Sequence, residues 1–200
     1  MFLAPLPGGE TLFVRPHTKH LQTMSKIELR WYSFKLVPSD TASEVTRKLV
    51  RNGVDLLDVP NSVYVIRLSS MFLIQYSKDG HSPVIYIGEG RLRARLNSHR
   101  TWLHKLQLLL PQAAFEVKVC FPQDSLKNPI NKEYESNLLQ FFIKKYGQLP
   151  LRNRKQKMND GDINFSKTGR QQILGPGTGK RYTWAIKPLL SKIPFSKYTG

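Results

Sequence analysis

The stretch PVIYIGEGRLRARLNSHR, residues 83–100, begins as an apolar run typical of a β-strand and continues as an arginine-rich segment with helical spacing. Gly88 and Gly90 separate the two parts, as glycine often does where the backbone changes conformation. Four arginines and one histidine follow between residues 91 and 100. The segment therefore predicts a strand that leads into a helix, and it raises the question of which charged side chain does chemistry.

The neighbouring segments predict the rest of a small module. Residues 62–70 and 114–122 have strand composition or alternation, and leucines from Leu92 to Leu110 recur at helical spacing over about five turns. A second helix is predicted over residues 128–147, with Asn128 as its cap, Pro129 in its first turn and Gly147 at its end. The order strand, strand, helix, strand, helix predicts an α/β (α+β) fold. We expect a mainly antiparallel sheet of three strands, or slightly more, flanked by helices.

The first part of the chain predicts further elements. Residues 27–37 have strand composition, and residues 39–57 predict a helix capped by Ser39 or Asp40. Residues 71–77 either continue the strand before them or form an extra one.

Charge points to the class of partner. The chain has 200 residues, with 31 Lys and Arg against 14 Asp and Glu, a formal charge of +17 that favours nucleic acid as partner. One cysteine excludes an internal disulfide framework, and no apolar run is long enough to cross a membrane. We expect a soluble cytoplasmic protein, monomeric or homodimeric, that does not bind membranes.

Five polar residues form a candidate site. Tyr64 and Tyr86 lie on consecutive predicted strands, so their hydroxyls share a face if the strands pair. Arg95 and His99 are four residues apart on the next helix, and therefore share a face of it. Glu135 borders an apolar stripe of the last helix, where a carboxylate needs a partner. Each residue alone has a structural explanation; together they predict convergence on one concave, basic face.

In this order the residues resemble the GIY-YIG endonuclease family over about residues 61–155. Ser62 stands where the family's first signature has glycine, and the interval from Tyr64 to Tyr86 is longer than usual, which suits an inserted strand. The resemblance divides the chain into an N-terminal extension (1–60), a nuclease-like core (61–155) and a basic C-terminal extension (156–200). The matching pieces are Val63-Tyr64, Tyr86-Ile87-Gly88, Leu92-xx-Arg95-xxx-His99, Glu135-xx-Leu138-Leu139 and Pro150-xx-Asn153.

The resemblance implies hydrolysis of phosphodiester bonds. Glu135 would hold one divalent ion, Mg²⁺ or Mn²⁺, and Arg95 would contact the scissile phosphate through its planar donor fork. Tyr64 would act as general base or orient the water, with Tyr86 and His99 in support. Because a tyrosine of ordinary pKa, about 10, is a poor base at neutral pH, a guanidinium or metal would have to lower that pKa.

Other basic and polar residues are predicted to contact nucleic acid rather than to react. Double-stranded DNA is the expected partner, with the two extensions supplying target recognition. A restriction, mobile-element or phage-associated nuclease fits these features, as do a binding protein with an inactive core and a structure-specific repair or recombination nuclease. The predicted contacts are Arg91, Arg93, Arg100, Lys144, Lys145, Arg152, Asn153, Arg154 and Lys155.

Overall fold

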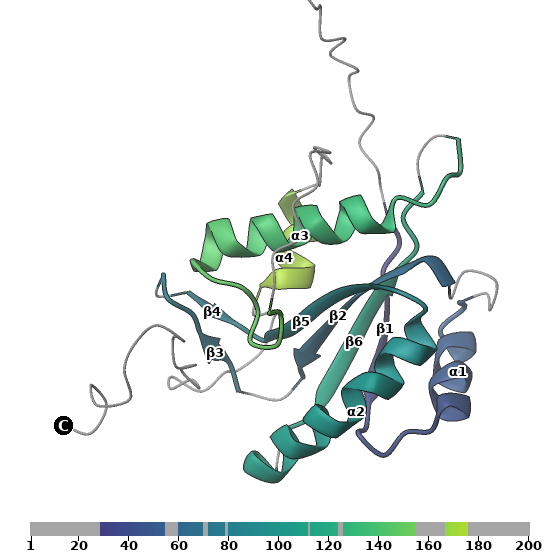
Figure 1. Cartoon of the computed structure of the whole chain (residues 1–200), viewed down its shortest axis with the longest axis horizontal. Helices are drawn as coiled ribbons and strands as arrows, with labels where there is room; N and C mark the ends of the chain where they lie inside the picture. Colours follow the sequence, from purple (N-terminus) through teal and green to yellow (C-terminus); the bar gives the residue numbers. More distant parts are fainter. Residues whose placement is uncertain are drawn as a thin grey trace, which may run out of the picture.

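A four-stranded antiparallel sheet forms the centre of the computed structural model, with strand order β1-β6-β2-β5 (Figure 1). The predicted α+β class with a mainly antiparallel sheet is confirmed. The structure describes residues 29–54, 60–69, 72–78, 80–111, 113–123, 126–154 and 167–175. The strands of this sheet are β1 (Tyr32–Leu36), β2 (Ser62–Leu68), β5 (Val84–Gly90) and β6 (Phe115–Cys120).

A short hairpin precedes β5. It pairs β3 (Ile74–Gln75) with β4 (His81–Ser82) outside the main sheet. The backbone N–H of Tyr76 donates to the carbonyl of Gly80 at 2.9 Å, and the Tyr76 hydroxyl donates to the carbonyl of Val84 at 2.5 Å. Of the two alternatives for residues 71–77, the structure therefore contains the extra strand.

Helices cover both faces of the sheet. Figure 1 shows α1 (Ala42–Arg51) and α2 (Leu92–Leu109) on one side, and α3 (Asn131–Tyr146) and α4 (Lys167–Leu174) on the other. Apolar residues of every strand of the main sheet and of the helices form one continuous core. Because β1 pairs with β6 in this sheet, the boundary predicted at residue 60 runs through a single sheet and core.

Helix α1 begins later than its sequence predicts. Its cap is Thr41, which accepts from the backbone N–H of Glu44 while the Glu44 carboxylate accepts from the N–H of Thr41. Such a capping box satisfies two exposed N–H groups of the first turn. Asp40, one of the two predicted caps, instead accepts from the N–H of Val37 and pairs with Lys48.

Helix α3 also begins later than predicted but ends as expected. It starts at Asn131 rather than at Asn128, because Pro129 forms a β-bridge with Gln123 and remains extended. Gly147 follows the last turn with φ +82°, the left-handed conformation that glycine adopts without a steric penalty.

The carbonyls at the end of α4 bond to side chains of the sheet and of α3. The buried guanidinium of Arg67 on β2 donates to the carbonyls of Gln172 and Gly175, at 2.7 and 2.9 Å. The Tyr146 hydroxyl donates to the carbonyl of Leu174 at 3.0 Å. These bonds satisfy carbonyls that a helix leaves unpaired at its C-terminus. The described part of the C-terminal extension therefore belongs to the core.

The outer edge of β5 is paired with the segment after α3. The N–H of Arg152 donates to the carbonyl of Ile85 at 3.0 Å. The side chain of Asn153 accepts from the N–H of Ile87 at 3.0 Å and donates to its carbonyl at 2.7 Å. One amide side chain thus satisfies both backbone groups of an edge residue, as a neighbouring strand would.

Asn153→Ala should destabilise the fold. It removes both bonds to Ile87 and leaves a half-buried N–H and C=O unpaired, so the free energy of unfolding should fall by about 1–3 kcal/mol. Urea unfolding would measure the change. Arg154→Ala, at the exposed next position, is the control and should change stability by less than about 0.5 kcal/mol. Equal effects of the two variants would contradict this role of Asn153.

Candidate active site

The pairing of β2 with β5 places the two tyrosines on one face of the sheet. Tyr64 lies opposite Gly88, and Ile66 lies opposite Tyr86. Residues directly opposite in an antiparallel pair point to the same side, so Tyr64 and Tyr86 are diagonal neighbours. Their ring centroids are 5.9 Å apart, as the spacing of the two predicted strands led us to expect.

Gly88 leaves the space into which both rings extend. A Cβ atom at this position would lie 2.4 Å from Cε1 of Tyr86 and 2.8 Å from the hydroxyl oxygen of Tyr64. Both distances are shorter than carbon–carbon and carbon–oxygen contacts allow. Glycine at position 88 is therefore required by the close approach of two aromatic side chains.

His99 completes an aromatic cluster with these tyrosines. It lies on the buried side of α2, and its Nε2 is 2.9 Å from the Tyr64 hydroxyl oxygen. The imidazole centroid is 4.5 Å from that of Tyr86 and 5.9 Å from that of Tyr64. The structure thus brings three of the five predicted catalytic residues into direct contact.

Trp102, which sequence reasoning did not single out, supports the other side of His99. Its indole N–H donates to Nδ1 of His99 at 3.0 Å. The guanidinium carbon of Arg152 lies 5.3 Å from the centroid of the Trp102 ring. The spacing of three residues from His99 is a sequence signal for contact on one helix. Arg152 follows α3 and pairs with the edge of β5, so no helical spacing in the sequence indicates its contact with Trp102.

Burial dominates the protonation of Tyr64. The side chain is fully buried, and this raises its pKa well above the ordinary value, with a further increase from Tyr86. The Arg95 charge lowers the pKa, as expected, but burial outweighs it. The guanidinium alone therefore does not bring the pKa of Tyr64 below its ordinary value, and Tyr64 keeps its proton at neutral pH.

His99 is neutral at the same pH. Burial, with smaller contributions from the positive charges of Arg95 and Arg152, lowers the pKa of its imidazole from 6.5 to about 4. Both residues that meet at the 2.9 Å contact are thus uncharged at neutral pH.

The four arginines of the opening stretch have different surroundings. Arg95 is exposed, lies beside Gly90, and acts through its charge on Tyr64 and His99. Arg100 donates to the carbonyls of Pro38 and Ser39, which ties α2 to the segment before α1. The two others are Arg91, the N-cap of α2, and Arg93, which lines a groove beside α1.

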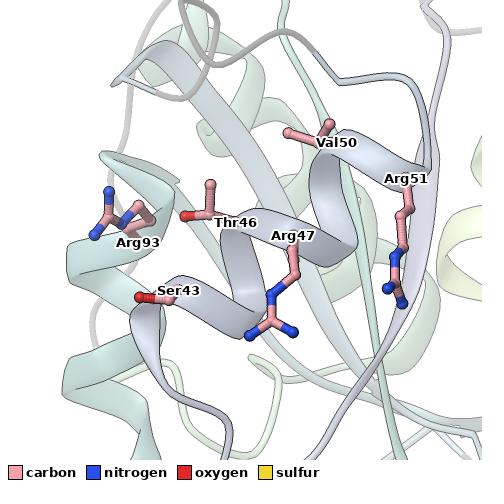
Figure 2. A pocket seen from close by; sticks show the side chains of 6 residues that line it. All are labelled: Ser43, Thr46, Arg47, Val50, Arg51 and Arg93. Atoms are coloured by element: carbon pink, nitrogen blue, oxygen red, sulfur yellow. The ribbon is translucent and has the colours of Figure 1, made fainter.

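The groove lies between α1 and α2 and has a volume of about 430 Å³. Figure 2 shows the guanidinium groups of Arg47, Arg51 and Arg93 spread around it. Ser43 and Thr46 add hydroxyl groups. Only Arg93 of these five is a predicted nucleic-acid contact, although Arg47 and Arg51, four residues apart on α1, are a signal detectable in the sequence.

Glu135 approaches from the other side of the sheet. Its helix, α3, bonds through Asn131 to Glu89, and Glu89 lies opposite Val63, on the face away from Tyr64. The charge of Glu135 nevertheless raises the pKa of Tyr64, as the smallest of the effects on that hydroxyl. The expected convergence on one face thus holds for four residues, while the helix of the fifth covers the opposite face.

The donor chemistry fits a single hard cation. In the described part of the chain, no three His, Cys, Asp or Glu side chains group closely enough to hold a metal. Glu135 is a buried carboxylate, and Mg²⁺ and Mn²⁺ prefer oxygen ligands of this kind. A cation here would have one protein carboxylate, with water and substrate oxygens as its other ligands.

Several predicted contacts lie farther along the chain. Lys144 and Lys145 are exposed in the last turn of α3, and Arg154 is exposed beyond it. Both polar ends of the Asn153 side chain bond to Ile87, a structural role that its prediction as a nucleic-acid contact did not include. Lys155 lies outside the described residues.

Comparison of the chain with family models, curated proteins and solved structures gives no match. None of the helices in the described ranges is long and apolar enough to cross a membrane.

The shifted pKa of His99 predicts a pH dependence of stability. Between about pH 6.5 and about pH 4 the unfolded chain binds a proton at His99 that the folded chain does not. The free energy of unfolding should therefore fall as pH is lowered through this range. His99→Asn should remove this part of the slope, while it also lowers stability at every pH through the lost bond to Tyr64. Urea unfolding at steps of pH would test this, and equal slopes would contradict it.

Proposed function

We propose that the chain is a metal-dependent endonuclease of the GIY-YIG type that hydrolyses phosphodiester bonds in DNA. One observation carries the proposal: Tyr64, Tyr86 and His99, from two strands and a helix, meet in a single cluster. Their order along the chain is that of the family's motifs.

The charges around the cluster suit phosphate chemistry. Hydrolysis of a phosphodiester requires an oriented water and neutralisation of the charge that develops on the phosphoryl oxygens. Arg95 is exposed beside the cluster and would contact the scissile phosphate through two N–H groups. Glu135 would hold Mg²⁺ or Mn²⁺, which when bound supplies positive charge near the leaving 3′ oxygen.

The tyrosines and His99 would orient groups rather than exchange protons in the free protein. Tyr64 keeps its proton at neutral pH, and the neutral imidazole of His99 is too weak an acid to give up its one N–H. Tyr86 is half-buried and is therefore the member of the cluster that can touch a water or phosphate outside it. We therefore assign the contact with water or phosphate to Tyr86, and we assign to Tyr64 the role of holding the Tyr86 ring and hydroxyl in position.

The groove between α1 and α2 would guide the DNA backbone. Its arginines lie on helices that cover the same face of the sheet as the tyrosines. Arginines on two neighbouring helices suit successive phosphates of one strand better than a single anion.

A DNA-binding protein with an inactive core is the second candidate. The observation in its favour is the complete burial of Tyr64 with its raised pKa, which makes this residue a poor base. Incubation of plasmid with the protein in Mg²⁺ and in EDTA separates the two functions. Cleavage in Mg²⁺ alone supports the nuclease, whereas binding without cleavage supports the inactive core. Branched and linear substrates would then distinguish a structure-specific nuclease from the other types.

Arg95→Ala should abolish most cleavage with little effect on binding. It removes one phosphate contact among several, but leaves the charge of the transition state unmatched, which commonly lowers the rate by about 10²–10³-fold. Arg95→Lys should recover little, because an ammonium group does not reproduce the planar fork. Arg91→Ala removes the same charge from the start of the same helix and is the control. Comparable losses of single-turnover rate for Arg91→Ala and Arg95→Ala would contradict a specific role for Arg95.

Arg51→Ala should weaken DNA binding and reduce its dependence on salt. Each phosphate contact that is lost lowers the slope of log affinity against log salt by about 0.9 on duplex DNA. Fluorescence anisotropy over a range of salt concentrations would measure the slope. Lys35→Ala removes one exposed charge from β1 and is the control. An unchanged slope for Arg51→Ala would show that Arg51 in this groove does not contact the DNA backbone.

A further inference from the structure

The imidazole of His99 is held at both of its nitrogens. Nδ1 lies 3.0 Å from the indole nitrogen of Trp102, and Nε2 lies 2.9 Å from the hydroxyl oxygen of Tyr64. His99 and Tyr64 are both buried. Each contact has the length of a true hydrogen bond.

The two contacts together determine where the proton of the ring lies. An indole nitrogen can only donate, so Nδ1 of His99 must accept and cannot carry a proton. A neutral imidazole has one N–H, which must then be on Nε2. Because this N–H points at Tyr64, the tyrosine oxygen is the acceptor of the 2.9 Å bond.

We propose that Trp102 is a positioning residue that fixes His99 as the Nε2–H tautomer, so that His99 donates a hydrogen bond to Tyr64 and cannot take its proton. The hydrogen bonds then run in one direction, from Trp102 to His99 to Tyr64. Since the Tyr64 oxygen already accepts from His99, its own hydrogen is directed elsewhere. The hydrogen bond between the Tyr64 and Tyr86 side chains directs it to Tyr86.

A positively charged His99 is opposed by its surroundings. Protonation would place an N–H on Nδ1, directly against the N–H of Trp102. The positive charges of Arg95 and Arg152 act against it as well, and burial disfavours the charged ring. The Arg152 guanidinium lies over the face of the Trp102 ring. Among the described residues, Tyr64 and Tyr86 are the other titratable groups whose rings face the imidazole.

The consequence for the reaction rests on the proposed function. Negative charge on the Tyr64 oxygen would meet the N–H of His99, while His99 itself would have no free nitrogen to accept a proton. His99 therefore assists as a fixed donor and is excluded as general base. Replacement of Trp102 would remove the constraint and allow the other tautomer, which turns a lone pair toward the Tyr64 oxygen.

Nitrogen-15 NMR of the histidine rings tests the tautomer directly. In the wild-type protein, the His99 signals should show a protonated Nε2 and an unprotonated Nδ1 at neutral pH. The spectrum of His99→Asn, which lacks these signals, identifies them among the five histidines of the chain. A protonated Nδ1 in the wild-type protein would overturn the proposal without the need for any variant.

Trp102→Phe tests whether the tryptophan imposes this state. The ring remains but its N–H is lost, so the spectrum should show a mixture of the two His99 tautomers. Trp31→Phe is the matched control, because it removes an indole N–H at another place in the fold, where Trp31 packs on Tyr134 of α3. An unchanged His99 tautomer in folded Trp102→Phe would contradict the role of Trp102. If this variant does not fold, the wild-type spectrum still decides whether Nδ1 is the acceptor that the proposal requires.

Cleavage by Trp102→Phe measures the link to catalysis. The single-turnover rate should fall by about tenfold, the scale on which loss of an orienting hydrogen-bond partner acts, while DNA affinity stays the same. If the NMR spectrum shows the expected tautomer but the wild-type protein does not cut DNA, the tautomer proposal stands and the proposed nuclease function is disproved. The expected tautomer shift with an unchanged cleavage rate would overturn the catalytic part of the proposal.

Discussion

The antiparallel register of β2 with β5 from Ser62 to Ile66, before a shift at Arg67, holds the candidate site together. It sets Tyr64 opposite Gly88 and Ile66 opposite Tyr86, so both tyrosines point toward α2 and His99. A shift by one residue would turn every side chain of the strand to the other face. The tyrosines would then leave His99, and apolar residues would leave the core that α1 and α2 cover. The core and the site therefore depend on the same register.

The segment after α3 extends this dependence to a distant part of the chain. Asn153 and Arg152 pair with the backbone of β5 at its outer edge, which is the strand that carries Tyr86. The same pairing positions the Arg152 side chain over Trp102, and Trp102 bonds to His99. Asn153 and Arg152 thus connect the pairing of the sheet edge to the orientation of the His99 imidazole.

Burial, rather than charge, determines protonation in the cluster. Arg95 favours the ionised form of Tyr64, but the loss of solvent around the hydroxyl has the larger effect and keeps it protonated. For His99, burial and positive neighbours act in the same direction and keep the ring neutral. Two neutral groups with a defined direction of hydrogen bonding can be buried at low cost, because each donor meets an acceptor.

The sequence by itself determined the strands of the main sheet, the approximate positions of α1, α2 and α3, and the faces of four of the five predicted site residues. Alternation places Tyr64 and Tyr86 on one side of paired strands, and helical spacing places Arg95 with His99, because both patterns are local properties of the backbone. Only the tertiary structure decided that β1 pairs with β6, that α3 brings Glu135 from the opposite face, and that Arg152 reaches Trp102. These depend on contacts between distant segments, which are selected by packing of the whole core and leave no periodic signal in the chain.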